Sequence, residues 1–173
     1  MKRILLLVIL SLGLSAVSVA GELPTGVIKL TPYEAPPLRL ADMDGQVTDL
    51  RRLRGQWVLV HFWAAWCVPC RRELPALTRV FKDHSDRLPR LVMVNTADTE
   101  NEVFAFLGKV APDESTLLDK DGQVTERWKP RGLPASYFVD PEGRIRYLAL
   151  GGRPWDQPPY RRFLESLKAG KAP

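Results

Sequence analysis

The chain has 173 residues, of which 45% are hydrophobic and 26% are charged, a composition typical of one globular domain. It excludes a largely disordered chain and a protein with many membrane spans. The net charge is +5, and without Lys2 and Arg3 it is +3, from 23 basic and 20 acidic residues. A charge this small and this evenly spread along the sequence does not indicate a nucleic-acid partner.

The N-terminal segment has the order of a secretory signal peptide. Lys2 and Arg3 precede an uncharged, mostly apolar run over residues 4–20, which ends in small residues. We expect residues 1–20 to be a signal peptide cleaved after Ala20. A membrane span needs at least about 17 apolar residues, so an uncleaved anchor is the alternative. In both cases we expect the domain to lie in the periplasm or on the outer side of the cell envelope, free or tethered by one helix.

Residues 21–37 contain four prolines and little periodicity, and they are interpreted as an extended lead-in without stable structure of its own. The domain is expected over residues 38–169. It starts with a β-hairpin signal, in which residues 38–40 and 46–48 flank the turn sequence at 42–45.

A buried strand and a helix follow the hairpin. Residues 57–63 are almost continuously apolar, as in a central strand covered on both faces, and only His61 interrupts them. The spacing then predicts a helix over 68–81 and another short strand over 91–95. A strand, a helix and a strand in this order form a right-handed βαβ unit with parallel strands.

Later residues complete an α/β pattern. The spacing predicts a helix at 100–109, a strand at 116–118, a helical turn ending near 128, strands at 136–139 and 145–150, and a helix at 160–168. A proline and a glycine in the turn at 140–143 make the last two strands an antiparallel hairpin. The expected fold is therefore α/β, with a central mixed sheet flanked by helices.

The two cysteines, Cys67 and Cys70, are separated by two residues at the start of the helix predicted at 68–81. A cysteine attacks a disulfide as its thiolate, which the unpaired N–H groups and the dipole of a helix N-terminus stabilise. Cys70 lies one turn along, where it can attack a mixed disulfide. We therefore predict a redox-active Cys67–Cys70 disulfide, with Cys67 as the nucleophile and Cys70 as the resolving thiol.

Other uses of this motif fit less well. A zinc site needs further ligands, and only His61 and His84 remain as soft candidates, neither with the spacing of a second ligand pair. A structural disulfide across so short a loop constrains the unfolded chain very little. We therefore expect no metal and no cofactor.

Two segments resemble the thioredoxin superfamily. Residues 58–70, VLVHFWAAWCVPC, resemble its active-site signature, and residues 132–143, GLPASYFVDPEG, resemble the segment that holds its cis-proline. With the leading hairpin and the sequence at 71–73 the chain is most similar to the TlpA/ResA-like branch, whose members are exported thiol-disulfide oxidoreductases. The resemblance covers residues 36–167. It implies a thioredoxin fold with an N-terminal β-hairpin extension.

The resemblance also assigns substrate contacts. Pro134 matches the cis-proline that faces the cysteine pair, and there it helps the backbone of Leu133 to hold an extended substrate chain. Proline has no N–H, so a substrate can pair in strand fashion beside the sulfur. The predicted substrate-binding residues are Pro134, Leu133, Trp66, Val68 and Pro69.

Two ionisable residues are candidates for tuning the thiols. Glu73 matches an acidic residue of the TlpA/ResA-like branch and is expected to tune thiol ionisation or move protons, or else to be a solvated carboxylate beside Arg71 and Arg72. His61 departs from the family, because many thioredoxins have a buried aspartate there. Its neutral imidazole can take the proton of Cys70, or it can be a hydrogen-bonded core residue with no catalytic role.

The resemblance implies a protein-disulfide reductase acting on exported proteins, such as apocytochrome c or copper-site assembly proteins, with electrons from a membrane thiol protein. A copper-binding chaperone on the same fold is the alternative, but that group has CxxxC and a distant histidine, whereas this chain has no histidine after His84. A peroxidase would need threonine or serine where Ala64 stands.

Overall fold

The computed structural model describes residues 22–173, so the predicted signal peptide or anchor lies outside the described residues. In the described part of the chain, no helix combines the length and the apolar character that crossing a membrane requires.

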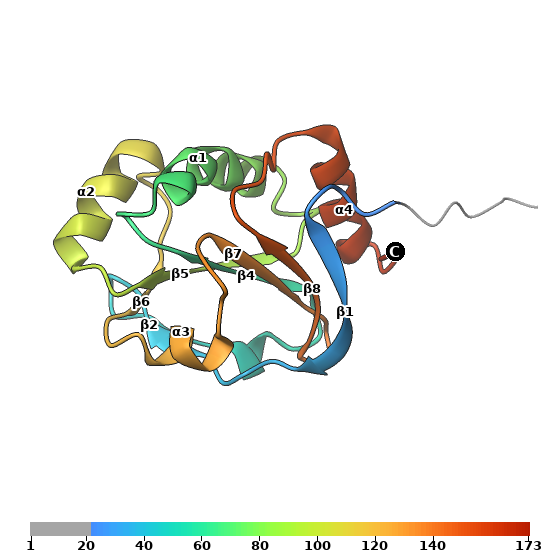
Figure 1. The fold of residues 1–173 in the computed structure, drawn as a ribbon, viewed down its shortest axis with the longest axis horizontal. Coiled ribbons are helices and arrows are strands. Elements are labelled where there is room, and N and C mark those ends of the chain that lie inside the picture. Colours follow the sequence, from blue (N-terminus) through green and yellow to red (C-terminus); the bar gives the residue numbers. More distant parts are fainter. Residues whose placement is uncertain (1–21) are drawn as a thin grey trace, which may run out of the picture.

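The centre of the molecule is a six-stranded mixed sheet in the order β1-β8-β7-β4-β5-β6 (Figure 1). Its strands are β1 Val27–Glu34, β4 Val58–Trp63, β5 Arg90–Thr96, β6 Leu117–Asp119, β7 Ala135–Val139 and β8 Arg144–Leu150. Strand β4 pairs parallel with β5 and antiparallel with β7, and all six of its residues are buried. The predicted mixed sheet and its fully covered central strand are therefore confirmed.

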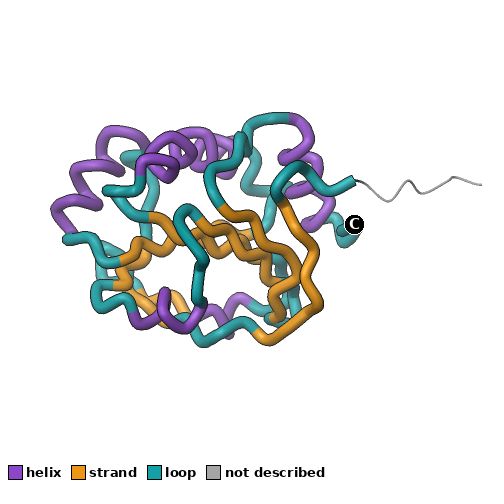
Figure 2. Tube along the Cα trace, viewed as in Figure 1, coloured by secondary structure: helices purple, strands orange, loops and turns teal. Residues whose placement is uncertain are grey.

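Helices cover both faces of the sheet (Figures 1 and 2). The helices α1 Val68–Asp83, α2 Glu100–Val110 and α4 Pro158–Lys168 lie on one face. The short helix α3 Gln123–Trp128 and the 3-10 turn η1 Leu50–Leu53 lie on the other. The buried apolar side chains accordingly form two clusters, one on each side of the sheet. Each cluster buries one face of the same strands, because neighbouring residues in a strand point to opposite faces.

The predicted hairpin is present as a separate two-stranded sheet of β2 Arg39–Ala41 and β3 Val47–Asp49. Its turn is held by Asp42, whose Oδ1 accepts hydrogen bonds from the backbone N–H groups of Asp44 and Gln46 at 3.0 and 2.8 Å. A backbone bridge between Asp42 and Leu117 ties the hairpin to the start of β6. The N-terminal hairpin extension of the fold is therefore confirmed.

The segment before the hairpin corrects the sequence analysis. Residues 21–37 were expected to have no stable structure of their own, whereas Val27–Glu34 form β1, paired antiparallel with β8. An edge strand pairs on one side only, so the missing N–H of Pro32 is tolerated, and the register shifts between Lys29 and Tyr33 on either side of it. Most residues of β1 are exposed, so the strand lacks the apolar alternation by which strands are predicted.

Candidate active site

The cysteine pair lies where the central strand passes into the first helix. Cys67 is the N-cap of α1, with an extended backbone, and its Sγ accepts the backbone N–H of Cys70 at 3.2 Å. Cys67 and Cys70 form a disulfide, with their Cα atoms 5.3 Å apart. The Cys67 sulfur therefore occupies the position in which a capping side chain receives the free N–H groups and the positive end of the helix.

An exposed apolar surface surrounds the pair. The Cys67 residue is 4% exposed and Cys70 is fully buried, whereas Trp66 is 66% exposed and Val68 is 52% exposed. Pro69, in the first turn of α1, is exposed as well. Large exposed apolar side chains beside a reactive group are typical of a surface that contacts a partner.

The segment with Pro134 reaches the same edge of the sheet. The peptide bond between Leu133 and Pro134 is cis. Strand β7 follows directly and runs antiparallel to β4, with Ala135 paired to Phe62. Pro134 therefore lies near the end of β4 from which the chain continues to Cys67. Leu133 packs against the apolar cluster that contains both cysteines.

Glu73 is buried, so the alternative of a solvated carboxylate is wrong. Its Oε1 accepts a hydrogen bond from Trp155 Nε1, and within residues 22–173 its Oε2 has no partner. Burial raises the pKa of Glu73 from 4.5 to about 8, and the Trp155 hydrogen bond, the nearby backbone N–H of Arg153 and the Arg153 charge offset only part of this rise. At neutral pH the carboxyl group is therefore mostly protonated.

The loop after β8 packs close to this carboxyl group at Gly152. A Cβ at Gly152 would lie 3.6 Å from the carbonyl oxygen of Pro69 and 3.8 Å from Glu73 Oε2. This loop, which also carries Trp155, therefore covers Glu73 on the side of the first turn of α1.

His61 is also fully buried. Its Nδ1 lies 2.9 Å from Ser136 Oγ, on the residue paired with it across β4 and β7, and within the described chain its Nε2 has no partner. Burial lowers the pKa of His61 from 6.5 to about 3, so the imidazole is neutral at physiological pH. His61 lies on the same face of β4 as Leu59 and Trp63, because residues two apart in a strand point to the same side. Leu59 and Trp63 face α1 and belong to the apolar cluster that contains the cysteines.

Two polar residues that support the site, Trp155 and Asp98, were not found from the sequence. The indole of Trp155, which lies 82 positions along the chain, binds Glu73. Asp98, just after β5, accepts the backbone N–H of Ala65 at 2.5 Å and the amide of Asn95 at 2.7 Å, so it holds the segment that leads into Cys67. Trp155 and Asp98 both lie in loops, where no periodic pattern marks a residue as buried.

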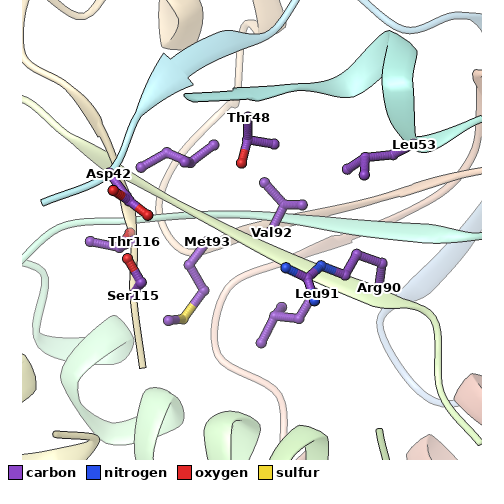
Figure 3. A pocket seen from close by; sticks show the side chains of 10 residues that line it. Asp42, Thr48, Leu53, Arg90, Leu91, Val92, Met93, Ser115 and Thr116 are labelled. Atoms are coloured by element: carbon purple, nitrogen blue, oxygen red, sulfur yellow. The ribbon is translucent and has the colours of Figure 1, made fainter. Parts of the chain in front are cut away.

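Residues 22–173 contain no cluster of three or more histidine, cysteine, aspartate or glutamate residues that can hold a metal ion. A pocket of about 110 Å³ lies between the β2–β3 hairpin and β5 (Figure 3). It is lined by Arg90–Met93, at the start of β5, whereas the cysteines follow the end of the parallel strand β4. Neither cysteine lines this pocket, nor do Glu73, His61 or Pro134, so it is no part of the cysteine site.

The comparison with models of protein families shows to which family the chain belongs. The model of the AhpC/TSA family matches residues 32–148. The chain belongs to the AhpC/TSA family.

The chain is also similar to two curated proteins and to a solved structure with related names. The chain is 29% identical over 118 residues to the thiol-disulfide oxidoreductase ResA of Bacillus subtilis, an alignment that covers 68% of this chain and 66% of ResA. It is 32% identical over 121 residues to the thioredoxin-like protein YneN of the same organism, covering 68% of this chain and 70% of YneN. Among solved structures, the thioredoxin domain of a thiol-disulfide oxidoreductase from Bacteroides vulgatus has a TM-score of 0.65 and 28% identity, covering 78% of this chain and 99% of that domain.

These findings confirm the resemblance to the ResA-like thioredoxins, the thioredoxin fold and the enzyme class. This AhpC/TSA member is a thiol-disulfide oxidoreductase of the ResA type, with Cys67 and Cys70 as its cysteine pair.

Proposed function

We propose that the protein reduces disulfides of exported proteins, with Cys67 as the nucleophile and Cys70 as the resolving thiol. The observation that carries this proposal is the Cys67 sulfur at the N-cap of α1, where it accepts the N–H of Cys70. A helix N-terminus favours the thiolate, which is the attacking form of cysteine.

The exchange runs in two steps. The Cys67 thiolate attacks one sulfur of the substrate disulfide, the substrate S–S bond breaks, and its other sulfur leaves as a thiolate. The Cys70 thiolate then attacks the Cys67 sulfur, which forms the Cys67–Cys70 disulfide and releases the second substrate thiolate. Two electrons pass from the enzyme to the substrate, and each released thiolate takes a proton from its surroundings.

Glu73 and His61 are proposed to move protons in this cycle. Glu73 holds a proton at neutral pH and can donate it, whereas His61 is neutral and, because burial disfavours its charged form, can pass a proton on only by releasing another. Each has one polar atom without a partner in the described chain, Glu73 Oε2 and His61 Nε2. Glu73 is on the buried side of α1, and His61 shares a face of β4 with Leu59 and Trp63, which belong to the same apolar cluster as Cys70.

Substrate contacts are proposed at Leu133, Pro134, Trp66, Val68 and Pro69. An extended substrate chain would pair with the backbone at Leu133 and lay its apolar side chains on the exposed surface of Trp66 and Val68. The closeness of Pro134 to the end of β4 supports this arrangement.

The cellular role is proposed from the N-terminal sequence and from the resemblance to the TlpA/ResA-like branch. Residues 1–20 support export to the periplasm or cell-envelope exterior, with or without cleavage. The proposed substrates are disulfide-containing exported proteins, such as apocytochrome c or copper-site assembly proteins. A membrane thiol protein would re-reduce the Cys67–Cys70 disulfide.

Substitution of the resolving thiol tests the proposal. Cys70→Ser removes the second step, so mixed disulfides with substrates should accumulate on Cys67 in the cell envelope and disappear on treatment with dithiothreitol. Cys67→Ser is the matched control and should trap nothing. The absence of trapped species in the Cys70→Ser strain would contradict the proposal.

The redox potential tests the direction of electron flow. A potential near that of thioredoxin, about −270 mV, supports a reductase, whereas one near about −120 mV would identify an oxidant.

A further inference from the structure

The residues just after the cysteine pair are basic and exposed. Arg71 and Arg72 follow Cys70 directly, on the first turns of α1. Residues four positions apart lie on the same face of a helix, so Arg71 lies one turn behind Cys67, and Arg72 one turn behind Val68. Both guanidinium groups therefore border the surface that a substrate has to approach.

A second pair of basic residues comes from the loop between α3 and β7. Lys129 and Arg131 are exposed and precede the cis bond at Pro134. That loop returns the chain to the end of β4, where the cysteine motif begins. Arg131, three residues before Pro134, thus brings positive charge towards this edge from a second element, whereas Lys129 ends α3 on the other face of the sheet.

Acidic groups near this edge do not neutralise these charges. Glu73 and Asp98 are buried, and Glu73 is mostly protonated at neutral pH. At the start of α2, Glu100 pairs with Lys120 at 2.5 Å, whereas Glu102 keeps its charge in the capping box with Thr99 and forms no ion pair with these basic residues in the described part of the chain.

Among residues 22–173, the four basic residues have no ionic partner of their own. No carboxylate within residues 22–173 lies within 4.0 Å of the charged groups of Arg71, Arg72, Lys129 or Arg131. The guanidinium of Arg71 lies instead over the ring of Phe106, at 5.7 Å from its centroid.

We propose that the exposed arginines Arg71, Arg72 and Arg131, here called the basic face, select substrate proteins whose disulfide is flanked by acidic residues. The inference rests on the proposed disulfide exchange and adds the chemistry of its partner. Complementary charge steers encounters and speeds association, by about tenfold or more at low ionic strength, and it discourages partners of the same sign. The near-balanced charge of the whole chain does not weaken the effect, because Arg71 and Arg72 follow the cysteine pair directly and Arg131 stands three residues before Pro134.

Two synthetic disulfide peptides test the inference. They share one intramolecular disulfide and differ only in having aspartate or lysine residues on both sides of it. Each second-order rate constant with the reduced protein is divided by the rate constant of the same peptide with dithiothreitol, which removes the intrinsic reactivity of the peptide. We expect the acidic peptide to react about tenfold faster at low salt, and the preference to fade towards 1 M salt, where the Debye length is about 3 Å.

Matched variants assign the preference to the basic face. The triple variant Arg71→Gln, Arg72→Gln, Arg131→Gln should lose most of the preference. The control triple variant removes the same number of charges at exposed arginines away from the cysteines, Arg39, Arg52 and Arg162, each to glutamine, and should keep it.

Three outcomes would overturn the inference while the proposed function stands. In the first, the two peptides react at equal corrected rates. In the second, both triple variants lose the preference for the acidic peptide equally. In the third, the basic face binds anionic phospholipid vesicles and the protein shows no preference between the peptides. Failure of the reduced protein to react with either peptide would instead refute the proposed function, and the inference with it.

Discussion

Replacement of Glu73 by glutamine should change how the stability of the protein depends on pH. Burial raises the pKa of Glu73 from 4.5 to about 8. Between these two values the unfolded chain carries an ionised carboxylate, whereas the folded protein keeps the group protonated. Folding then takes up a proton, so the free energy of unfolding falls as the pH rises. The contribution of Glu73 is fully present below about pH 4.5 and is lost as the pH passes through the folded pKa of about 8.

The size of this change in the free energy of unfolding follows from the pKa shift of Glu73. One pKa unit corresponds to about 1.4 kcal/mol, so from pH 5 to pH 8 the wild type should lose about 4 kcal/mol that the glutamine variant keeps. The pKa of His61 is lowered to about 3, so His61 reduces stability as the pH falls below 6.5, but it does so equally in both proteins. The difference between wild type and variant therefore isolates Glu73.

Urea denaturation of the oxidised proteins at pH 5, 6, 7 and 8 measures this difference. The free energy of unfolding of Glu73→Gln minus that of the wild type should rise steadily with pH. The exposed carboxylate of Glu165 on α4 provides the control variant, Glu165→Gln, for which the difference should stay flat. A Glu73→Gln difference that changes by less than about 0.5 kcal/mol over this range would refute the reasoning, because Glu73 would then ionise as readily in the folded protein as in the unfolded chain.

Three further substitutions test two hydrogen bonds of the site and the packing of one buried side chain in α4. Trp155→Phe removes the N–H that Glu73 accepts, so the pKa of Glu73 should move further up and stability at pH 8 should fall by about 1–3 kcal/mol, measured in the same urea series. Ser136→Ala leaves His61 Nδ1 without its partner and should cost about 1–3 kcal/mol at pH 7; an unchanged urea midpoint would show that the contact is not needed. Leu164→Ala in the fully buried face of α4 should cost about 2–5 kcal/mol in thermal or urea unfolding, and a cost typical of a surface substitution would contradict the observed burial.

Elements with strong periodicity were predictable from the sequence. The apolar run of β4 and the helical spacing of α1 locate the βαβ unit, and the cysteine pair at their junction identifies the chemistry. Strand β1 was not predictable in this way, because its stability comes from pairing with β8 rather than from a buried face. Its Pro32 also resembles the prolines of an unstructured lead-in.

The environment of Glu73 was only partly predictable. Helical spacing does place it on the buried face, since it is three residues after Cys70 and four before Leu77, both of which are buried. The adjacent arginines, Arg71 and Arg72, favoured the opposite interpretation, a solvated carboxylate. Its partner Trp155 comes from a distant loop, and such a contact is fixed by the tertiary fold and not by local sequence.

Alkylation of the reduced protein tests most directly whether Cys67 is the reactive thiol. Iodoacetamide at pH 7, followed by mass spectrometry of peptides, reports the rate at each cysteine. Because the Cys67 sulfur caps α1 and Cys70 is fully buried, Cys67 should react faster than free cysteine, and Cys70 should react far more slowly. A Cys67 that reacts no faster than free cysteine, or no faster than Cys70, would contradict its assignment as the nucleophile.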